Sequence, residues 1–247
     1  MKFKPKILFL DILTDDRRER ELVSKKVYKG TYSEAMRMAF GLNKDQWTVV
    51  YAPHDKFPVS LDGIDALVIG GSFHDPINKS VKPWMRKTFD FIKLVSAAEM
   101  PILGICGGLQ FTVRAFGGEV IRNPKGREFG TINLDILSAG AGDKLFSGLP
   151  KSVFAQSSHK CMANSLKPGW KLLASSKLCR NQAVAIGKNI RLLQFHPEMT
   201  AHQLLAIAKY KKEPASPSKD ASLYGKKIIH NFLEYFVLPY HRKKMIK

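Results

Sequence analysis

The sequence predicts an α/β fold of three layers, in which a mainly parallel central sheet is flanked by helices on both faces. Short apolar runs alternate along the chain with segments whose apolar residues recur at helical spacing. Such alternation is typical of strand–helix–strand units, whose right-handed crossovers build a parallel sheet with both faces covered. Several runs end in glycine, cysteine or histidine, which favours a functional site at the carboxyl edge of the sheet.

The first half of the chain alternates most clearly. Strands are expected there at Lys6–Leu10, Trp47–Ala52, Ala66–Ile69 and Pro101–Ile105. Helices are expected between them, including Tyr32–Phe40 and Trp84–Ala98. From Glu119 onward short strands dominate, and they are expected at Thr131–Leu137, Val153–Gln156, Trp170–Ser175, Gln182–Gly187 and Ile190–Phe195. A helix at Lys226–Val237, with apolar residues at helical spacing, is expected to pack on the sheet and close the fold.

We expect residues 1–247 to form one domain, with a core at about 6–200 and C-terminal helices in 201–247. Thr14–Tyr32 is dense in charge and is expected to be an exposed loop or short helix near the site, with a role as a lid as one possibility. Lys211–Ser222, which contains prolines and several serines, is expected to be a mobile connection. The basic tail after Val237 is expected to be disordered.

A nucleophile motif lies in residues 101–110, which read Pro-Ile-Leu-Gly-Ile-Cys-Gly-Gly-Leu-Gln. An apolar strand stops at Gly104, Cys106 follows between glycines, and a helical stretch begins near Leu109. A strand–turn–helix of this kind lifts a side chain out of the sheet, and the positive end of the helix favours the reactive thiolate. The alternative is a small buried hydrophobic residue, which is the commoner role of a lone cysteine.

A histidine at the end of another strand supplies the matching base. The strand Ile190–Phe195 runs into His196, and Glu198 follows after Pro197, whose fixed φ helps to hold the two side chains in place. A cysteine nucleophile needs a base, and the base needs a third group that orients it. Taken alone, this segment reads as a strand end with solvated polar residues.

A third strand ends in glycines at Gly70 and Gly71. Glycine lets backbone amides approach a ligand closely, so the amides of Gly71 and Gly107 are expected to form an oxyanion hole for a tetrahedral intermediate. The alternative for Gly70 and Gly71 is an ordinary turn.

These segments, in this order, resemble the class I glutamine amidotransferase family, from about residue 6 to about residue 200. Residues 104–110 are similar to the nucleophile motif of the family, and residues 195–198 are similar to its His–Glu motif. Among relatives, the resemblance is greatest to the glutaminase domain of GMP synthetase, whose Arg-Glu-Tyr/Phe-Gly and Ser-His motifs match residues 127–130 and 158–159. The pattern differs at Gly107, Leu109 and Cys161.

The resemblance implies a flavodoxin-like sheet and hydrolysis of the side-chain amide of L-glutamine by a triad of Cys106, His196 and Glu198. Cys106 would form a γ-glutamyl thioester, His196 would protonate the departing ammonia and then activate water, and Glu198 would orient His196. The resemblance also places substrate contacts at a further set of residues: Gly70, Gln110, Ser157 and Ser158.

The fate of the ammonia stays open in the sequence, because the chain has no Gly-rich phosphate loop for an ATP-using synthetase. One hypothesis is a glutaminase that serves a separate synthetase subunit. A second is a stand-alone hydrolase of γ-glutamyl peptides or amides with the same triad. A third is a catalytically silent binding protein, which the intact triad disfavours.

Composition agrees with a compact soluble enzyme of a reducing compartment, and we expect a cytoplasmic location. Three cysteines do not make a disulfide framework, and the histidines and cysteines lack the spacing of metal ligands, so no metal is expected. No cofactor is expected either. No segment reaches the roughly 20 apolar residues of a membrane span. The net charge of +19 fits a solvated basic surface, and nucleic acid is not expected as a partner because no binding module accompanies the scattered lysines.

Overall fold

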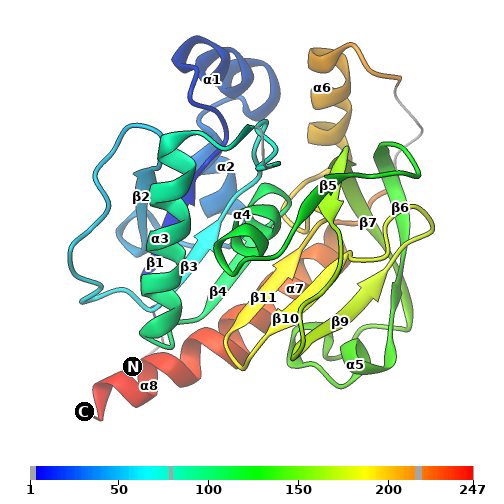
Figure 1. The fold of residues 1–247 in the computed structure, drawn as a ribbon. Coiled ribbons are helices and arrows are strands. Elements are labelled where there is room, and N and C mark those ends of the chain that lie inside the picture. Colours follow the sequence, from blue (N-terminus) through cyan, green and yellow to red (C-terminus); the bar gives the residue numbers. More distant parts are fainter. Residues whose placement is uncertain (1–3, 78–79, 215–218, 247) are drawn as a thin grey trace.

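The computed structural model describes residues 4–77, 80–214 and 219–246, and in them the centre of the fold is a sheet of nine strands (Figure 1). In spatial order the strands are β2 (Trp47–Tyr51), β1 (Ile7–Asp11), β3 (Ala66–Ile69), β4 (Ile102–Ile105), β11 (Ile190–Leu193), β10 (Ala183–Ile186), β9 (Trp170–Ser175), β6 (Glu128–Ile136) and β7 (Ser152–His159). Strands β2 to β11 pair in parallel, and those from β11 to β7 pair antiparallel. A smaller sheet pairs β5 (Val120–Arg122) with β8 (Cys161–Ala163).

Helices cover both faces of the parallel half, and the alternation of side chains along each strand explains why (Figure 1). In β1, Ile7 and Phe9 belong to a core shared with α2 (Tyr32–Ala39) and α7 (Ser222–Phe232). Leu8 and Leu10 belong to the opposite core, which is shared with α3 (Pro83–Ala97) and α4 (Gly107–Ala115). Both sides of β1 are therefore buried between helices.

The predicted fold class is confirmed as an α/β fold, with the difference that the sheet is mixed. The antiparallel half contributes as many strand pairings as the parallel half, because the later strands are joined mostly through turns and short helices, α5 (Ser138–Ala141) among them. The predicted strands and the helices at 32–40 and 84–98 all occur, with ends shifted by a few residues. Strand β7 is longer than predicted and extends to His159.

The predicted disorder of the tail after Val237 is wrong. A π-helical turn (Leu233–Val237) leads into α8 (Leu238–Met245), which is anchored to the parallel half of the sheet. The buried carboxylate of Asp65 accepts hydrogen bonds from His241 Nδ1 and Lys244 Nζ, both at 3.0 Å. The basic residues of the tail thus neutralise a buried acid, which composition alone did not reveal.

Two flanking segments contain helices, as the short helix expected in Thr14–Tyr32 and the C-terminal helices expected in 201–247 required. The charged segment after Thr14 forms α1 (Arg17–Val23) and a π-helical turn (Ser24–Tyr28), and its residues Val23 and Val27 are buried in the core. Helix α6 (Ala201–Lys211) follows the last strand. Of the predicted mobile connection, residues 212–214 and 219–221 are irregular and residues 215–218 lie outside the described residues. Within the described ranges, no helix is both long and apolar enough to cross a membrane.

Candidate active site

Cys106 occupies a sharp turn between β4 and α4. Its backbone has φ 52° and ψ −100°, a conformation in which a non-glycine residue is strained. The turn is possible because Gly108 lies against β3, where an added Cβ would stand only 2.4 Å from the carbonyl oxygen of Ile69. The cysteine N–H donates to Leu193 O at 2.7 Å, which fixes the turn to the neighbouring strand β11. The structure thus confirms the predicted strand–turn–helix, with the helix starting immediately after the cysteine.

His196 follows that neighbouring strand, so it reaches the same edge of the sheet as Cys106. Its backbone N–H donates to Gln156 O at 2.8 Å, and its Nδ1 lies 2.7 Å from Glu198 Oε1. Both side chains are only 7% exposed. Cys106 and His196 line the same small cavity, so the structure brings the three predicted triad residues together.

The charge of His196 is set by its neighbours. Burial disfavours the imidazolium, but the negative charges of Glu198 and of the Cys106 thiolate outweigh it and raise the pKa of His196 to about 10. Chemically, a cysteine sulfur and a protonated imidazole at one site can act as a nucleophile and as a proton donor for a leaving group.

The predicted oxyanion amides differ in their availability. The Gly71 N–H donates to the hydroxyl of Tyr32 at 2.6 Å. The N–H of Gly107 and that of Ser72 have no hydrogen-bond acceptor within the described part of the chain. These two amides are adjacent, because a Cβ added at Gly107 would lie 2.5 Å from the Ser72 nitrogen. Ser72 was not predicted, although its place directly after the two glycines was a usable signal.

Tyr32 anchors the loop that carries these amides, which gives a testable expectation. Tyr32→Phe keeps the ring packed against Phe9 but leaves the loop without its hydrogen bond. Since a hydrogen bond is worth about 1 kcal/mol, we expect kcat/KM for an amide substrate to fall about fivefold. The rate of Cys106 alkylation by iodoacetamide should stay unchanged. A rise in kcat/KM would instead mean that the hydroxyl competes with the substrate for the Gly71 amide.

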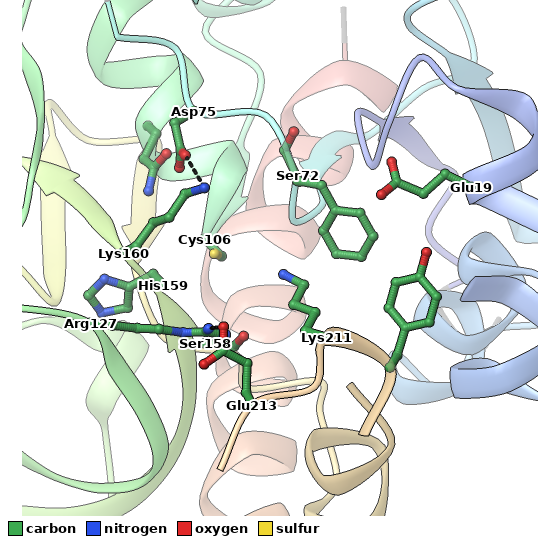
Figure 2. Close-up of a pocket in the computed structure, with 13 residues that line it drawn as sticks. Glu19, Ser72, Asp75, Cys106, Arg127, Ser158, His159, Lys160, Lys211 and Glu213 are labelled. Carbon is green, nitrogen blue, oxygen red and sulfur yellow. Dashed lines mark ion pairs between the residues drawn. The ribbon is translucent and has the colours of Figure 1, made fainter. Parts of the chain in front are cut away.

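A cavity of about 360 Å³ opens at Cys106, and His196 is not among the residues that line it (Figure 2). Gln110 and Ser158, two of the predicted substrate contacts, line it. The side-chain amide of Gln110 donates to Cys161 O at 3.0 Å, so its place in the wall is fixed. In Figure 2 the labelled side chains surround an open space in front of the Cys106 sulfur.

The other two predicted substrate contacts, Gly70 and Ser157, lie outside the cavities at Cys106 and make hydrogen bonds within the surrounding structure. Gly70 donates its N–H to Leu10 O and accepts from the Gly108 N–H at 2.9 Å, so its backbone joins β1 to the turn at Cys106. Ser157 is fully buried, and its hydroxyl lies 3.4 Å from the Glu128 carboxylate. Neither residue lines the cavity at Cys106.

The two remaining sequence motifs meet across neighbouring strands. Glu128 in β6 stands opposite His159 in β7, and the Glu128 Oε2 to His159 Nε2 distance is 3.0 Å. Ser176 donates to the other carboxylate oxygen at 2.5 Å, and Gln182 also donates to the carboxylate. This buried network holds Ser158 and His159 at the cavity wall. Sequence reasoning missed Gln194, whose side-chain amide points at the Cys106 sulfur from 3.7 Å.

The side chains that could bind a metal ion are dispersed. Across residues 4–77, 80–214 and 219–246, no three His, Cys, Asp or Glu side chains gather in a group that could hold one. Besides Cys106, Cys161 and Cys179 are buried free thiols, and burial raises the pKa of each to about 12.

Known proteins match both the sequence and the fold. The family model of class I glutamine amidotransferases matches residues 28–205. Gamma-glutamyl peptidase 3 of Arabidopsis thaliana is 29% identical over 188 residues, which is 74% of each chain. The glutamine-hydrolysing GMP synthase subunit of Archaeoglobus fulgidus is 29% identical over 152 residues, covering 61% of this chain and 75% of that protein.

Solved structures agree at the level of the fold. A glutamine amidotransferase of Thermotoga maritima superposes with a TM-score of 0.66 at 19% identity, covering 99% of this chain and 94% of that one. A glutamine amido transferase of Methylobacillus flagellatus gives a TM-score of 0.70 at 16% identity over 94% and 95% of the two chains. Since the family model spans more than half of the chain, this protein belongs to the class I glutamine amidotransferase family and is an amide hydrolase of that family.

Proposed function

We propose that the protein hydrolyses the side-chain amide of L-glutamine at Cys106 and releases glutamate and ammonia for a separate synthetase subunit. The observation that carries this proposal is the contrast between the two cavities that meet at Cys106. The one that includes His196 has a volume of about 20 Å³, whereas the one on the side of Gln110 and Ser158 has about 360 Å³.

The chemistry assigns one half of the substrate to each cavity. The leaving group must lie within hydrogen-bond reach of His196, because the imidazolium protonates it. A space of 20 Å³ is close to the minimum that holds one water molecule and suits ammonia, which is of similar size. The glutamyl half then occupies the larger cavity. Leu13, Met199 and Ile207 form the apolar part of the wall of the small cavity, and His196 and Lys211 are among its polar residues.

The proposed reaction proceeds in two steps. The Cys106 thiolate attacks the carboxamide carbon, and the amides of Gly107 and Ser72 stabilise the oxyanion. The C–N bond breaks as His196 gives its proton to the nitrogen, which leaves a γ-glutamyl thioester and ammonia. His196 then takes a proton from water as the water attacks the thioester, and glutamate leaves with the thiolate restored. Glu198 stabilises the positive charge of His196 in the resting state and in the second step.

A γ-glutamyl peptidase is the second candidate, and a comparison favours it. The Arabidopsis thaliana gamma-glutamyl peptidase 3 aligns over a larger share of this chain than the Archaeoglobus fulgidus GMP synthase subunit does. A peptide leaving group would need the small cavity to widen by movement of the side chains that line it. The nucleophile and base would act in the same way.

The test is glutamate release by the purified protein from L-glutamine and, in parallel, from a γ-glutamyl dipeptide. The proposal predicts turnover of L-glutamine, with stimulation by a synthetase that consumes ammonia. The first combination to try is ATP, xanthosine monophosphate and the synthetase subunit of a GMP synthase. The Cys106→Ala protein is the control in both reactions. Cleavage of the dipeptide with no reaction of L-glutamine would replace the proposal with the second candidate.

A further inference from the structure

The end of α6 places a lysine inside the substrate cavity. Lys211 is the last residue of α6 and lies beyond residues 28–205, which the family model matches. It lines both cavities at Cys106, and Figure 2 shows its ammonium group pointing into the open space from the side of the cavity opposite Asp75 and Lys160. The cation therefore faces the position where a bound glutamyl group would lie.

Lys211 differs from the other cations of the cavity in its partners. Lys160 pairs with Asp75 at 3.3 Å, and Arg127 pairs with Glu213. Lys211 has no ion pair with a carboxylate in the described part of the chain, and its Nζ lies 4.2 Å from the centre of the Phe73 ring. A cation–π contact compensates only part of the cost of removing an ammonium group from water. Burial and the nearby Arg127 charge accordingly lower the pKa of Lys211.

We propose that Lys211 binds the α-carboxylate of the glutamyl substrate and so selects for α-amino acid amides. This inference rests on the proposed cleavage of a γ-glutamyl amide, and it applies to glutamine and to γ-glutamyl peptides because both carry that carboxylate. An arriving carboxylate supplies the partner that the protein does not. The ring of Phe73 and the end of α6 hold the ammonium in place before the substrate binds.

The expected effect is on substrate binding. A hydrogen bond between charged groups is worth about 1.5 to 3 kcal/mol, so Lys211→Met should lower kcat/KM for L-glutamine by about 10- to 100-fold, mainly through KM. For 4-aminobutanamide, which is glutamine without its α-carboxylate, the same change should have little effect. Lys209→Met is the matched control, because Lys209 is exposed on the same helix.

A binding measurement separates this inference from the proposed function. L-Glutamate should protect Cys106 of the wild-type protein from iodoacetamide at a lower concentration than 4-aminobutanoate does. Lys211→Met should abolish that difference, and Lys209→Met should preserve it. Suppose that the wild-type protein turns over no amide while Lys211→Met still abolishes the difference between protection by L-glutamate and by 4-aminobutanoate. That result would support the inference and refute the proposed hydrolysis.

Two results would overturn the inference. One is that Lys211→Met weakens the protection of Cys106 equally for ligands with and without the α-carboxylate, while the thermal midpoint of unfolding is unchanged. The other is a wild-type protein that hydrolyses L-glutamine but is protected equally by L-glutamate and 4-aminobutanoate.

Discussion

Replacing Cys106 with alanine is expected to reduce glutamate release from L-glutamine to the background rate while the protein remains folded. The change removes the sulfur that forms the thioester, and the methyl group that replaces it is not a nucleophile. The cysteine is 5% exposed and the lost volume is small, so the free energy of unfolding should change by no more than about 1 to 2 kcal/mol. Glutamate release and a thermal unfolding curve measure the two effects.

Cys179→Ala is the matched control for this prediction. Cys179 is also buried and free, but burial raises its pKa to about 12 and it lies outside both cavities at Cys106. Its replacement should leave turnover near the wild-type value. Substantial turnover by the Cys106→Ala protein would contradict the assignment of the nucleophile.

Replacement of His196 should be more damaging than replacement of its partner Glu198. His196→Ala removes the proton donor and acceptor, for which a loss of about 10²- to 10⁴-fold in kcat is expected. Glu198→Gln retains a hydrogen-bond acceptor for Nδ1 and should cost less. An equal loss of kcat in both variants would mean that Glu198 does more than orient His196 and stabilise its positive charge.

The pH dependence distinguishes these roles. The negative charge of Glu198 favours protonated His196, whose pKa is raised to about 10 from an ordinary value of 6.5. Loss of that charge in Glu198→Gln should therefore lower the pKa of His196 and move the alkaline limb of the kcat profile toward neutral pH. An unshifted limb would assign it to another group.

The free energy of unfolding should also depend on pH through the protonation of His196. Because the pKa of His196 is higher in the folded state, the stability that its charge contributes is fully present below about pH 6.5 and is lost as pH rises through about 10. The difference in unfolding free energy between wild-type and Glu198→Gln proteins should therefore shrink between neutral pH and pH 10.

The sequence predicted the strands, the turn at Cys106 and the grouping of Cys106, His196 and Glu198, because each depends on a local pattern at a strand end. The features it did not predict depend on contacts between distant segments. The Tyr32 hydroxyl reaches Gly71 across 39 positions of sequence, and the Lys211 ammonium enters the cavity only because α6 returns to the site. The position of α8 depends on Asp65, which is buried and accepts a hydrogen bond from Lys244. The sequence does not show that Asp65 is buried, so it does not show that the carboxylate requires a cation.

The pairing of β4 with β11 has a consequence for how the protein loses activity. In the strand order of the described sheet, this ladder joins the strands from β2 to β4 to those from β11 to β7, and Cys106 and His196 each follow one of its strands. Any partial opening that detaches the antiparallel half would separate nucleophile from base even if every helix remained formed. The amide protons of Ile105 and Leu193 should then exchange with solvent in the same cooperative opening that inactivates the protein. On heating, turnover should therefore be lost when β4 and β11 separate, before helical structure is lost.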